Sequence, residues 1–172
     1  MKPRYLIEGF PGHPLHPPLT DATIGIYTLA TIFALLDVVG LVEQNAARGW
    51  WLALIVGLCS TVFTALTGFV EWLKITRGSK LWKTATAHMI AMLTATVLFG
   101  LTAAVGHDDY LRGDVTAASF VLTLAGFATL ALGGWLGGTI VFVHGMRVLS
   151  LAQEPFRRAI TPGHKEKEEA AS

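Results

Sequence analysis

The sequence predicts an all-α fold: a polytopic membrane protein built as a four-transmembrane-helix bundle, with both termini in the cytoplasm. Two observations support this class. Of the 172 residues, 52% are hydrophobic and 15% are charged, whereas an ordinary soluble domain carries about 25% charged residues. The chain also holds apolar runs as long as the ~20 residues with which a helix crosses a bilayer core of ~30 Å. The alternative is a very apolar soluble bundle.

The apolar runs define the expected helices in order. They cover residues 20–42, 50–75, 84–105 and 117–149. Each is expected to be a helix, because a spanning segment must satisfy its backbone polar groups internally. The polar links are too short for a second domain. We therefore expect one transmembrane domain over residues 20–151, between a cytoplasmic N-terminal segment (1–19) and a polar cytoplasmic tail (152–172). The sequence alone shows no clear internal repeat.

Basic residues in the short links predict the orientation of the bundle. The link after the third run, HDDYLRGD, is mainly acidic, whereas the link after the second run carries Lys74, Arg77, Lys80 and Lys83. Cytoplasmic links carry the excess of Lys and Arg, so this basic link and both termini are expected on the cytoplasmic side of the inner membrane. Trp50 and Trp51 at one boundary, and Trp72 and Trp82 at the other, are expected to be interface anchors.

Ionisable residues from all four runs and from the N-terminal segment are expected in one layer near the cytoplasmic helix ends. At 1.5 Å of rise per residue, this layer contains His13, His16, Asp21, Glu71, His88 and His144. Ionisable groups inside membrane helices are costly, usually face the bundle interior and mark functional sites. Their shared depth therefore predicts a polar site at the cytoplasmic mouth of the bundle.

The spacing of small and polar residues indicates which helix faces line this site. One polar stripe along the second run is formed by Ser60, Thr64, Thr67 and Glu71. In the fourth run, Gly137 and His144 share a face within and after the stretch GGWLGG. Two interpretations of these glycines remain open: they bring helices into close contact, or Gly137 clears room for a flat ligand.

The stretch GHPLHPPLTD, residues 12–21, precedes the first run. Its prolines disfavour helix in the residues before them, so the segment is expected to be extended and to hold His13 and His16 at the mouth of the bundle. Thr20 or Asp21 is expected to cap the first helix. The alternative is a capping motif whose histidines have no function.

Imidazole is the commonest protein ligand of metals and a frequent ligand of haem iron. Two histidines at one depth on neighbouring helices suit a haem b. We expect His88 and His144 as its axial ligands, with Gly137 beside it. Asp21 or Glu71 would orient an imidazole through its other nitrogen. The chain has no CxxCH motif, so the haem would be held without thioether links. The alternative is a zinc, iron or manganese ion bound by members of the set His13, His16, Glu71, His88 and His144.

Several function classes lack their motifs in this sequence. It contains neither the GxSxG of a serine hydrolase nor a Walker-type phosphate loop. The excess of Lys and Arg expected in cytoplasmic links already explains the basic link, so this link does not indicate nucleic-acid binding. A transporter of four helices would need to form a homo-oligomer. An electron-transfer or metal-binding protein is therefore favoured over a stand-alone enzyme.

Four stretches carry a resemblance to a known family: GHPLHPPLTDATIGIYTLATIFALLDV, GFVEWLKI, TATAHMIAML and GGWLGGTIVFVHGMRV. Over residues 9–150 the chain resembles the bacterial four-helix membrane family catalogued as domain of unknown function 2231. The resemblance implies histidine motifs at His13 and His16, at His88 and at His144. Some members carry a fused Rieske-type iron–sulfur domain, which implies a redox setting but no assigned reaction.

This chain departs from the family pattern in one place and lacks the fused domain. Relatives commonly have a further histidine after HPLHP, where this chain has Thr20 and Asp21. It has no CxH pair, so an iron–sulfur partner would be a separate protein, and a quinone is the other expected redox partner. The leading hypothesis is a membrane redox protein with haem b between the third and fourth helices. The alternatives are a non-haem metal protein for sensing or transport and a non-catalytic assembly subunit.

Overall fold

The computed structural model describes residues 5–10, 12–42, 44–148 and 155–161. Within these residues, the helices long and apolar enough to cross a membrane are α2 (His16–Val38), α3 (Gln44–Leu73), α4 (Lys80–Val105) and α6 (Ala117–Gly138), extended by the π-helix η1 (Thr139–Val143). The predicted all-α fold with four spanning helices is thereby confirmed. The tail predicted over 152–172 lies mostly outside the described residues.

Shorter elements precede, connect and follow the long helices. The N-terminal segment contains α1 (Tyr5–Glu8) and a small antiparallel hairpin of β1 (Gly9–Phe10) and β2 (His13–Pro14). Helix α5 (His107–Arg112) lies in the link between α4 and α6, and α7 (Phe156–Ala159) follows the bundle. None of these elements is long enough to span a membrane.

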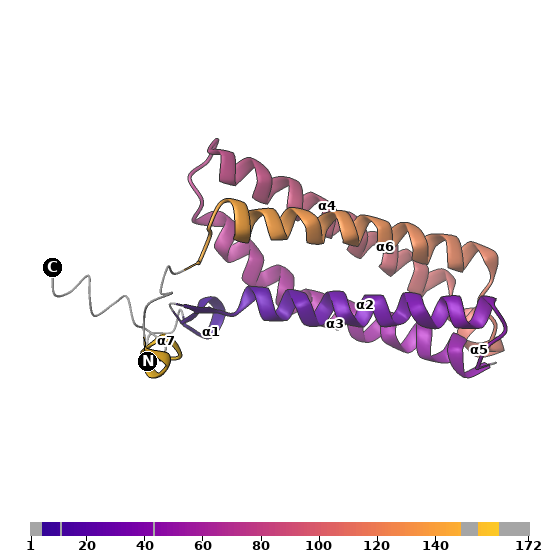
Figure 1. Cartoon of the computed structure of the whole chain (residues 1–172). Helices are drawn as coiled ribbons and strands as arrows, with labels where there is room; N and C mark the ends of the chain where they lie inside the picture. The colour runs from indigo at the N-terminus through magenta and orange to yellow at the C-terminus, as the bar shows by residue number, and fades with distance from the viewer. Residues whose placement is uncertain (1–4, 11, 43, 149–154, 162–172) are drawn as a thin grey trace, which may run out of the picture.

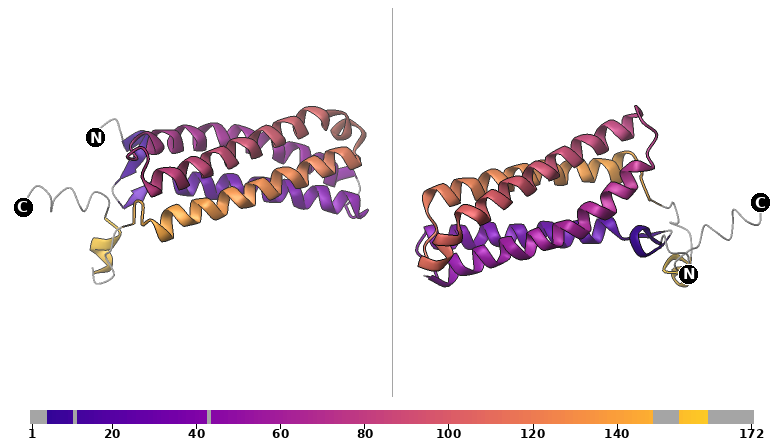
Figure 2. Two further views of the ribbon diagram at one scale, coloured as in Figure 1. Left: turned by 90° about the horizontal axis from the view of Figure 1, so that it is seen from above. Right: turned by 180° about the vertical axis from the view of Figure 1, so that it is seen from behind.

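The long helices form two antiparallel hairpins, α2 with α3 and α4 with α6 (Figure 1). The hairpins lie close together at the end that carries α5 and separate toward the opposite end (Figures 1 and 2). At that opposite end α3 ends and α4 begins. We call it the basic end because the link between these helices and the start of α4 carry Lys74, Arg77, Lys80 and Lys83.

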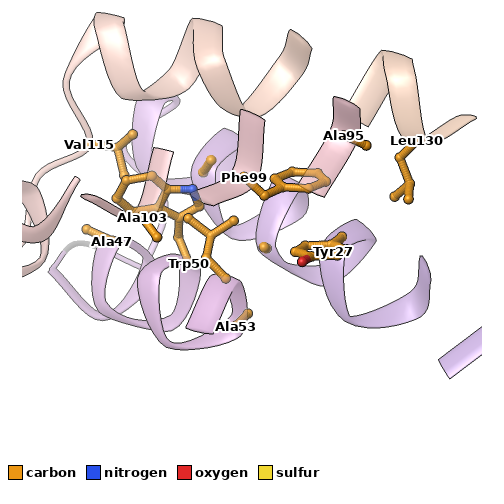
Figure 3. Close-up of a cluster of buried hydrophobic side chains, with 12 residues drawn as sticks. Tyr27, Ala47, Trp50, Ala53, Ala95, Phe99, Ala103, Val115 and Leu130 are labelled. Atoms are coloured by element: carbon orange, nitrogen blue, oxygen red, sulfur yellow. The ribbon is translucent and has the colours of Figure 1, made fainter. Parts of the chain in front are cut away.

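The buried hydrophobic core lies toward the α5 end of the bundle, and Figure 3 shows its side chains. Tyr27 and Phe99 stack between the hairpins, with ring centroids 4.0 Å and planes 6° apart. Trp50 is fully buried, and its Nε1 donates to the Thr123 hydroxyl at 3.0 Å. The prediction that Trp50 anchors the membrane interface is therefore wrong, because small core neighbours such as Ala47 admit the indole ring.

Helix α2 begins at His16, four residues before the predicted start. Pro17 and Pro18 occupy its first turn, where a missing N–H does no harm because that turn offers no intrahelical acceptor. The Thr20 hydroxyl donates to the His16 carbonyl at 2.9 Å. Thr20 and Asp21 therefore lie inside the helix, and the prediction that either of them caps it is wrong.

The fourth spanning helix ends at Val143, and the prediction that it continues to residue 149 is wrong. Gly145 has a φ of +67° and Arg147 a φ of +63°. A glycine in this left-handed conformation commonly terminates a helix. His144 is consequently the residue that follows the helix, one to two turns closer to its end than predicted.

Candidate functional site

A cavity of about 790 Å³ lies between the two hairpins toward the basic end. Residues of all four long helices and of η1 line it, and most of the wall is apolar, including Ile24, Met92 and Val141. Its volume is within the range of ~300–1,000 Å³ that ligand sites occupy. The ionisable side chains in this wall are few: His16, Asp21, Glu71, His88 and Arg147, besides Tyr27 at the inner end.

His16, the first residue of α2, is hydrogen-bonded to α3. Its Nδ1 lies 3.1 Å from the Thr64 carbonyl oxygen and 3.2 Å from the Thr67 hydroxyl. Because a carbonyl oxygen can only accept, Nδ1 carries the ring hydrogen and donates it. The Thr20 hydroxyl, 3.5 Å from Nε2, donates to the His16 carbonyl instead. Nε2 therefore keeps its lone pair, which is the form that binds a metal.

His88 repeats this arrangement in the second hairpin. It lies on α4, and its Nδ1 donates to the Gly133 carbonyl oxygen of α6 at 2.8 Å. The ring hydrogen is again on Nδ1, and Nε2 is again the nitrogen with a lone pair. Each hairpin thus presents one histidine in the same chemical form to the cavity.

The two imidazoles meet between the hairpins. The ring centroids of His16 and His88 are 6.5 Å apart and the ring planes are at 81°. A metal lies about 2.0–2.1 Å from an imidazole nitrogen, so two imidazoles on opposite sides of one metal have centres roughly 6.4 Å apart. The observed separation is close to this value, and it is also that of an edge-to-face contact between two rings.

A glycine of the neighbouring helix makes room for each imidazole. A Cβ atom added at Gly68 would lie 2.5 Å from Cε1 of His16, and one added at Gly137 would lie 3.2 Å from Cε1 of His88. At Gly68 only a residue without a side chain lets the ring lie this close to the backbone, and at Gly137 a side chain would require the ring to shift by a few tenths of an ångström. The space at Gly137, predicted to clear room for a flat ligand, is taken by the ring of His88 itself.

These contacts recur in the two hairpins at a nearly constant interval. Equivalent residues are 72 positions apart in the first helices and 69 apart in the second helices: His16 and His88, Tyr27 and Phe99, Thr64 and Gly133, Gly68 and Gly137. The equivalent aromatic rings stack on each other, and the equivalent imidazoles meet. The hairpins are therefore structural repeats related by an approximate twofold axis between them, of the kind seen in parallel membrane repeats.

Comparison with known proteins places the chain in a family. A sequence model of the predicted membrane proteins called domain of unknown function 2231 (DUF2231) matches residues 12–150. The chain belongs to the DUF2231 family. No curated protein and no solved structure matches it significantly. The family description states a membrane protein and no activity, so the chemistry of this DUF2231 protein must be argued from its site.

His144 does not take part in the cavity wall of this DUF2231 protein. Its half-buried ring is hydrogen-bonded to α4, with Nε2 3.0 Å from the Thr84 hydroxyl. The structure thus brings His88 together with His16, and His144 together with Thr84. The pair His88 and His144, expected from the sequence, stays a prediction that no contact between them supports.

His13 and Asp21 lie at the edge of the site. His13 is exposed and belongs to β2, where it pairs with Phe10. Asp21 is exposed on α2 and lines the rim of the cavity. Among the residues that the structure describes, no three His, Cys, Asp or Glu side chains are grouped so as to hold a metal ion. The non-haem alternative, which combined His13 with Glu71 and helix histidines, gains no support from this geometry.

Two residues of the site were not predicted from the sequence. Gly68 lies under His16, and Arg147 lies 3.4 Å from the Glu71 carboxylate at the mouth of the cavity. Gly68 lies inside the apolar run 50–75 and Arg147 near the end of the run 117–149, where neither residue stands out. The signal that could have found Gly68 is its offset of 69 positions from Gly137.

Proposed function

We propose that this DUF2231 protein holds one haem b between its hairpins and transfers electrons in the membrane, with His16 and His88 as axial ligands. The observation that carries the proposal is the imidazole pair, 6.5 Å between ring centroids, with each Nδ1 bonded to a backbone carbonyl. Metal-binding histidines commonly donate their other ring N–H to such a carbonyl, which fixes ring orientation and raises ligand basicity.

The surroundings of the pair fit a flat and mostly apolar group. The cavity holds about 790 Å³, its wall is largely aliphatic, and charged side chains are confined to its mouth. When bound, haem supplies one-electron reduction and oxidation at a potential set by axial ligands, burial and hydrogen bonds. The residues of the chain orient the two imidazoles, exclude water with apolar side chains and hold the group without a covalent link, since the only cysteine, Cys59, is not in a CxxCH motif.

This proposal revises the ligand pair expected from the sequence. His88 is retained, His16 replaces His144, and the twofold relation of the hairpins supports the exchange because His16 and His88 are the equivalent residues. His144 is proposed to have a structural role, joining the end of η1 to α4 through the Thr84 hydroxyl. Gly137 is proposed to support the ring of His88.

We also propose that the basic end faces the cytoplasm at a bacterial inner membrane. The cluster of four basic residues around the α3–α4 link supports this orientation. The electron partner is proposed to be a membrane quinone or a separate iron–sulfur protein, because the chain has no cysteine pair to hold a cluster of its own.

The first test is the absorption spectrum of the detergent-purified protein before and after dithionite. We expect a Soret band that shifts on reduction and sharp α and β bands, as six-coordinate haem gives. Metal analysis of the same sample gives the iron content per chain. A colourless protein from haem-replete cells, with or without bound zinc or manganese, would overturn the proposal.

A further inference from the structure

The cavity between the hairpins opens sideways toward the bilayer. Leu66 and Phe69 of α3 and Leu93 of α4 line it, yet all three side chains are exposed. They lie inside helices long and apolar enough to span a membrane, so the surface that they expose meets lipid rather than water. A molecule dissolved in the bilayer can therefore reach the cavity between α3 and α4.

Glu71 places a buried hydrogen-bond acceptor in the cavity wall. Its side chain is only 9% exposed, and its Oε1 has no hydrogen-bond partner among the residues that the structure describes. Arg147 Nη2 lies 3.4 Å away, beyond the ~2.7–3.2 Å of an N–H···O hydrogen bond. Buried polar atoms are nearly always hydrogen-bonded, and an exception calls for an explanation. A bound molecule that donates to Glu71 would supply one.

The charges around Glu71 already balance one another. A smaller hollow of about 550 Å³ shares Glu71 and Arg147 with the cavity, and its other charged residues are Glu8 and Lys74. Lys74 pairs with Glu8, and Arg147 is the cation nearest to Glu71. A cationic ligand would add an unbalanced charge beside Arg147, and burying such a charge is costly. The missing donor is thus expected on a neutral group, such as a hydroxyl.

The wall next to Glu71 suits a flat ring. Phe69 and Trp72 both line the cavity, and their rings stack with centroids 5.8 Å and planes 21° apart. Nε1 of Trp72 donates to the Thr86 hydroxyl of α4 at 3.0 Å, which fixes the indole between the hairpins. Aromatic side chains favour contacts with other aromatic rings. The expected ligand therefore combines lipid solubility, an aromatic ring and a hydroxyl group.

We propose that the cavity binds the hydroquinone form of a lipid-soluble quinone, with one ring hydroxyl donating to Glu71 Oε1. The oxidised quinone has carbonyl oxygens, which accept and cannot donate, so Glu71 makes the site selective for the reduced form. Glu71 lies seven residues beyond Thr64, whose carbonyl accepts from His16, a rise of about 10 Å along α3. The hydroquinone thus lies beside the imidazole pair. Its role as the electron partner rests on the proposed function, whereas its binding does not.

The test measures the binding of three ligands with the same decyl tail to the full-length protein in detergent. They are a decyl benzohydroquinone, its dimethyl ether, which keeps the ring and lacks the donor, and decylamine, a cationic donor. Titrations are followed by calorimetry without oxygen and with dithionite, which keeps the hydroquinone reduced. Glu71→Leu removes the acceptor, and Glu71→Gln keeps a neutral one. The control is Glu8→Gln, which removes an acid that lines the smaller hollow and not the cavity.

For the native chain we expect the hydroquinone to bind about ten- to one-hundredfold more tightly than the ether, as one hydrogen bond to a charged group supplies, and more tightly than decylamine. Glu71→Leu should remove the difference between hydroquinone and ether by weakening the hydroquinone alone. Glu71→Gln should keep part of it, and Glu8→Gln should preserve it.

Three results would overturn the assignment. They are equal affinity of the native chain for hydroquinone and ether, tightest binding of decylamine, and an equal loss of both ring ligands in Glu71→Leu, since Glu71 would then act on the fold rather than on the donor. The absorption spectrum of the same samples separates this outcome from that of the proposed function. A hydroquinone preference that depends on Glu71 in a protein without haem supports the site and rejects the haem, and haem without the preference does the reverse.

Discussion

A hydrogen bond to a backbone carbonyl fixes the tautomer of each imidazole, His16 and His88. Nδ1 of each ring donates to a carbonyl of the neighbouring helix, so Nε2 retains the lone pair that a metal requires. A carbonyl oxygen inside a helix has a second lone pair that can accept a side-chain donor, and such bonds also hold helices together in a bilayer. One contact therefore orients the ligand and joins the hairpin.

Removal of either cavity imidazole should abolish the six-coordinate spectrum. We expect His16→Ala and His88→Ala each to lose the sharp α and β bands, since one missing axial ligand leaves the iron five-coordinate or unbound. His144→Ala should retain the bands and lose only about 0.6 kcal/mol, the average for an interhelical hydrogen bond in a membrane protein. Reduced-minus-oxidised spectra and thermal unfolding of the three variants measure both effects. Loss of the bands in both His88→Ala and His144→Ala, with the bands retained in His16→Ala, would restore the ligand pair first expected from the sequence.

Alanine at Gly68 should displace the ring of His16. The added Cβ would lie 2.5 Å from a ring atom, so the imidazole must move and the axial bond must lengthen or break. Gly25→Ala is the control, because a Cβ there meets nothing within 4 Å and alanine favours the helix. We expect a weakened haem spectrum in Gly68→Ala and an unchanged one in Gly25→Ala. A haem spectrum of Gly68→Ala that equals those of the native protein and of Gly25→Ala would show that His16 is not a ligand.

The polar stripe of α3 explains how this helix pairs with α2. The Thr23 hydroxyl lies 2.7 Å from the Ser60 hydroxyl and 2.9 Å from that of Thr64, and Thr67 reaches His16. The sequence predicted the stripe by its helical spacing, and in the structure Thr64, Thr67 and Glu71 are buried while Ser60 is half-buried. Ser60 and Thr64 join α3 to α2, and Thr64 and Glu71 line the cavity.

Helix packing toward the α5 end should depend on Trp50 far more than on a tryptophan exposed to lipid. Trp50→Ala removes a fully buried indole and its bond to Thr123, and we expect about 3 kcal/mol of destabilisation, the lower end for such changes, because lipid adds little hydrophobic driving force. Trp135 is 78% exposed, and Trp135→Ala should change stability by less than about 0.5 kcal/mol. Unfolding in mixed micelles compares the two. Equal effects would contradict the buried role of Trp50.

The whole bundle is closed at one end and open at the other. At the α5 end, the Asp37 carboxylate accepts from the backbone N–H of Val115 at 2.7 Å, and Arg112 and Asp109 form an ion pair that lies beside Thr116. The first bond ties the end of α2 to the segment before α6, and the bond from Thr116 to Asp109 ties α5 to that same segment. At the basic end the hairpins separate, and the cavity lies between them.

The orientation of the bundle is testable with single cysteines. In a Cys59→Ser background, Arg77→Cys marks the basic end and His107→Cys marks the α5 end. We expect a membrane-impermeant maleimide to label His107→Cys in intact spheroplasts, and Arg77→Cys only after the membrane is opened, because basic links stay in the cytoplasm. The reverse pattern would invert the proposed topology.

Much of the architecture followed from the sequence, because hydrophobic length and polar spacing are local properties. The four spanning helices and the buried stripe of α3 were predicted from them. Helix ends were predicted less well: Pro17 and Pro18 fit the first turn of α2, and Gly145 ends the fourth helix before His144. Such ends depend on a few backbone dihedral angles that average hydrophobicity does not record.

The sequence by itself determined the class of the protein and the end of the bundle at which most of its ionisable residues lie, since both follow from helical rise and the thickness of a bilayer. Only the tertiary structure decided which histidines meet. Depth along a helix axis leaves the rotation of each helix and the choice of neighbours open, and these are set by packing of small residues such as Gly68 and Gly137 against the rings of another helix. That packing brought His16 to His88 and left His144 with Thr84.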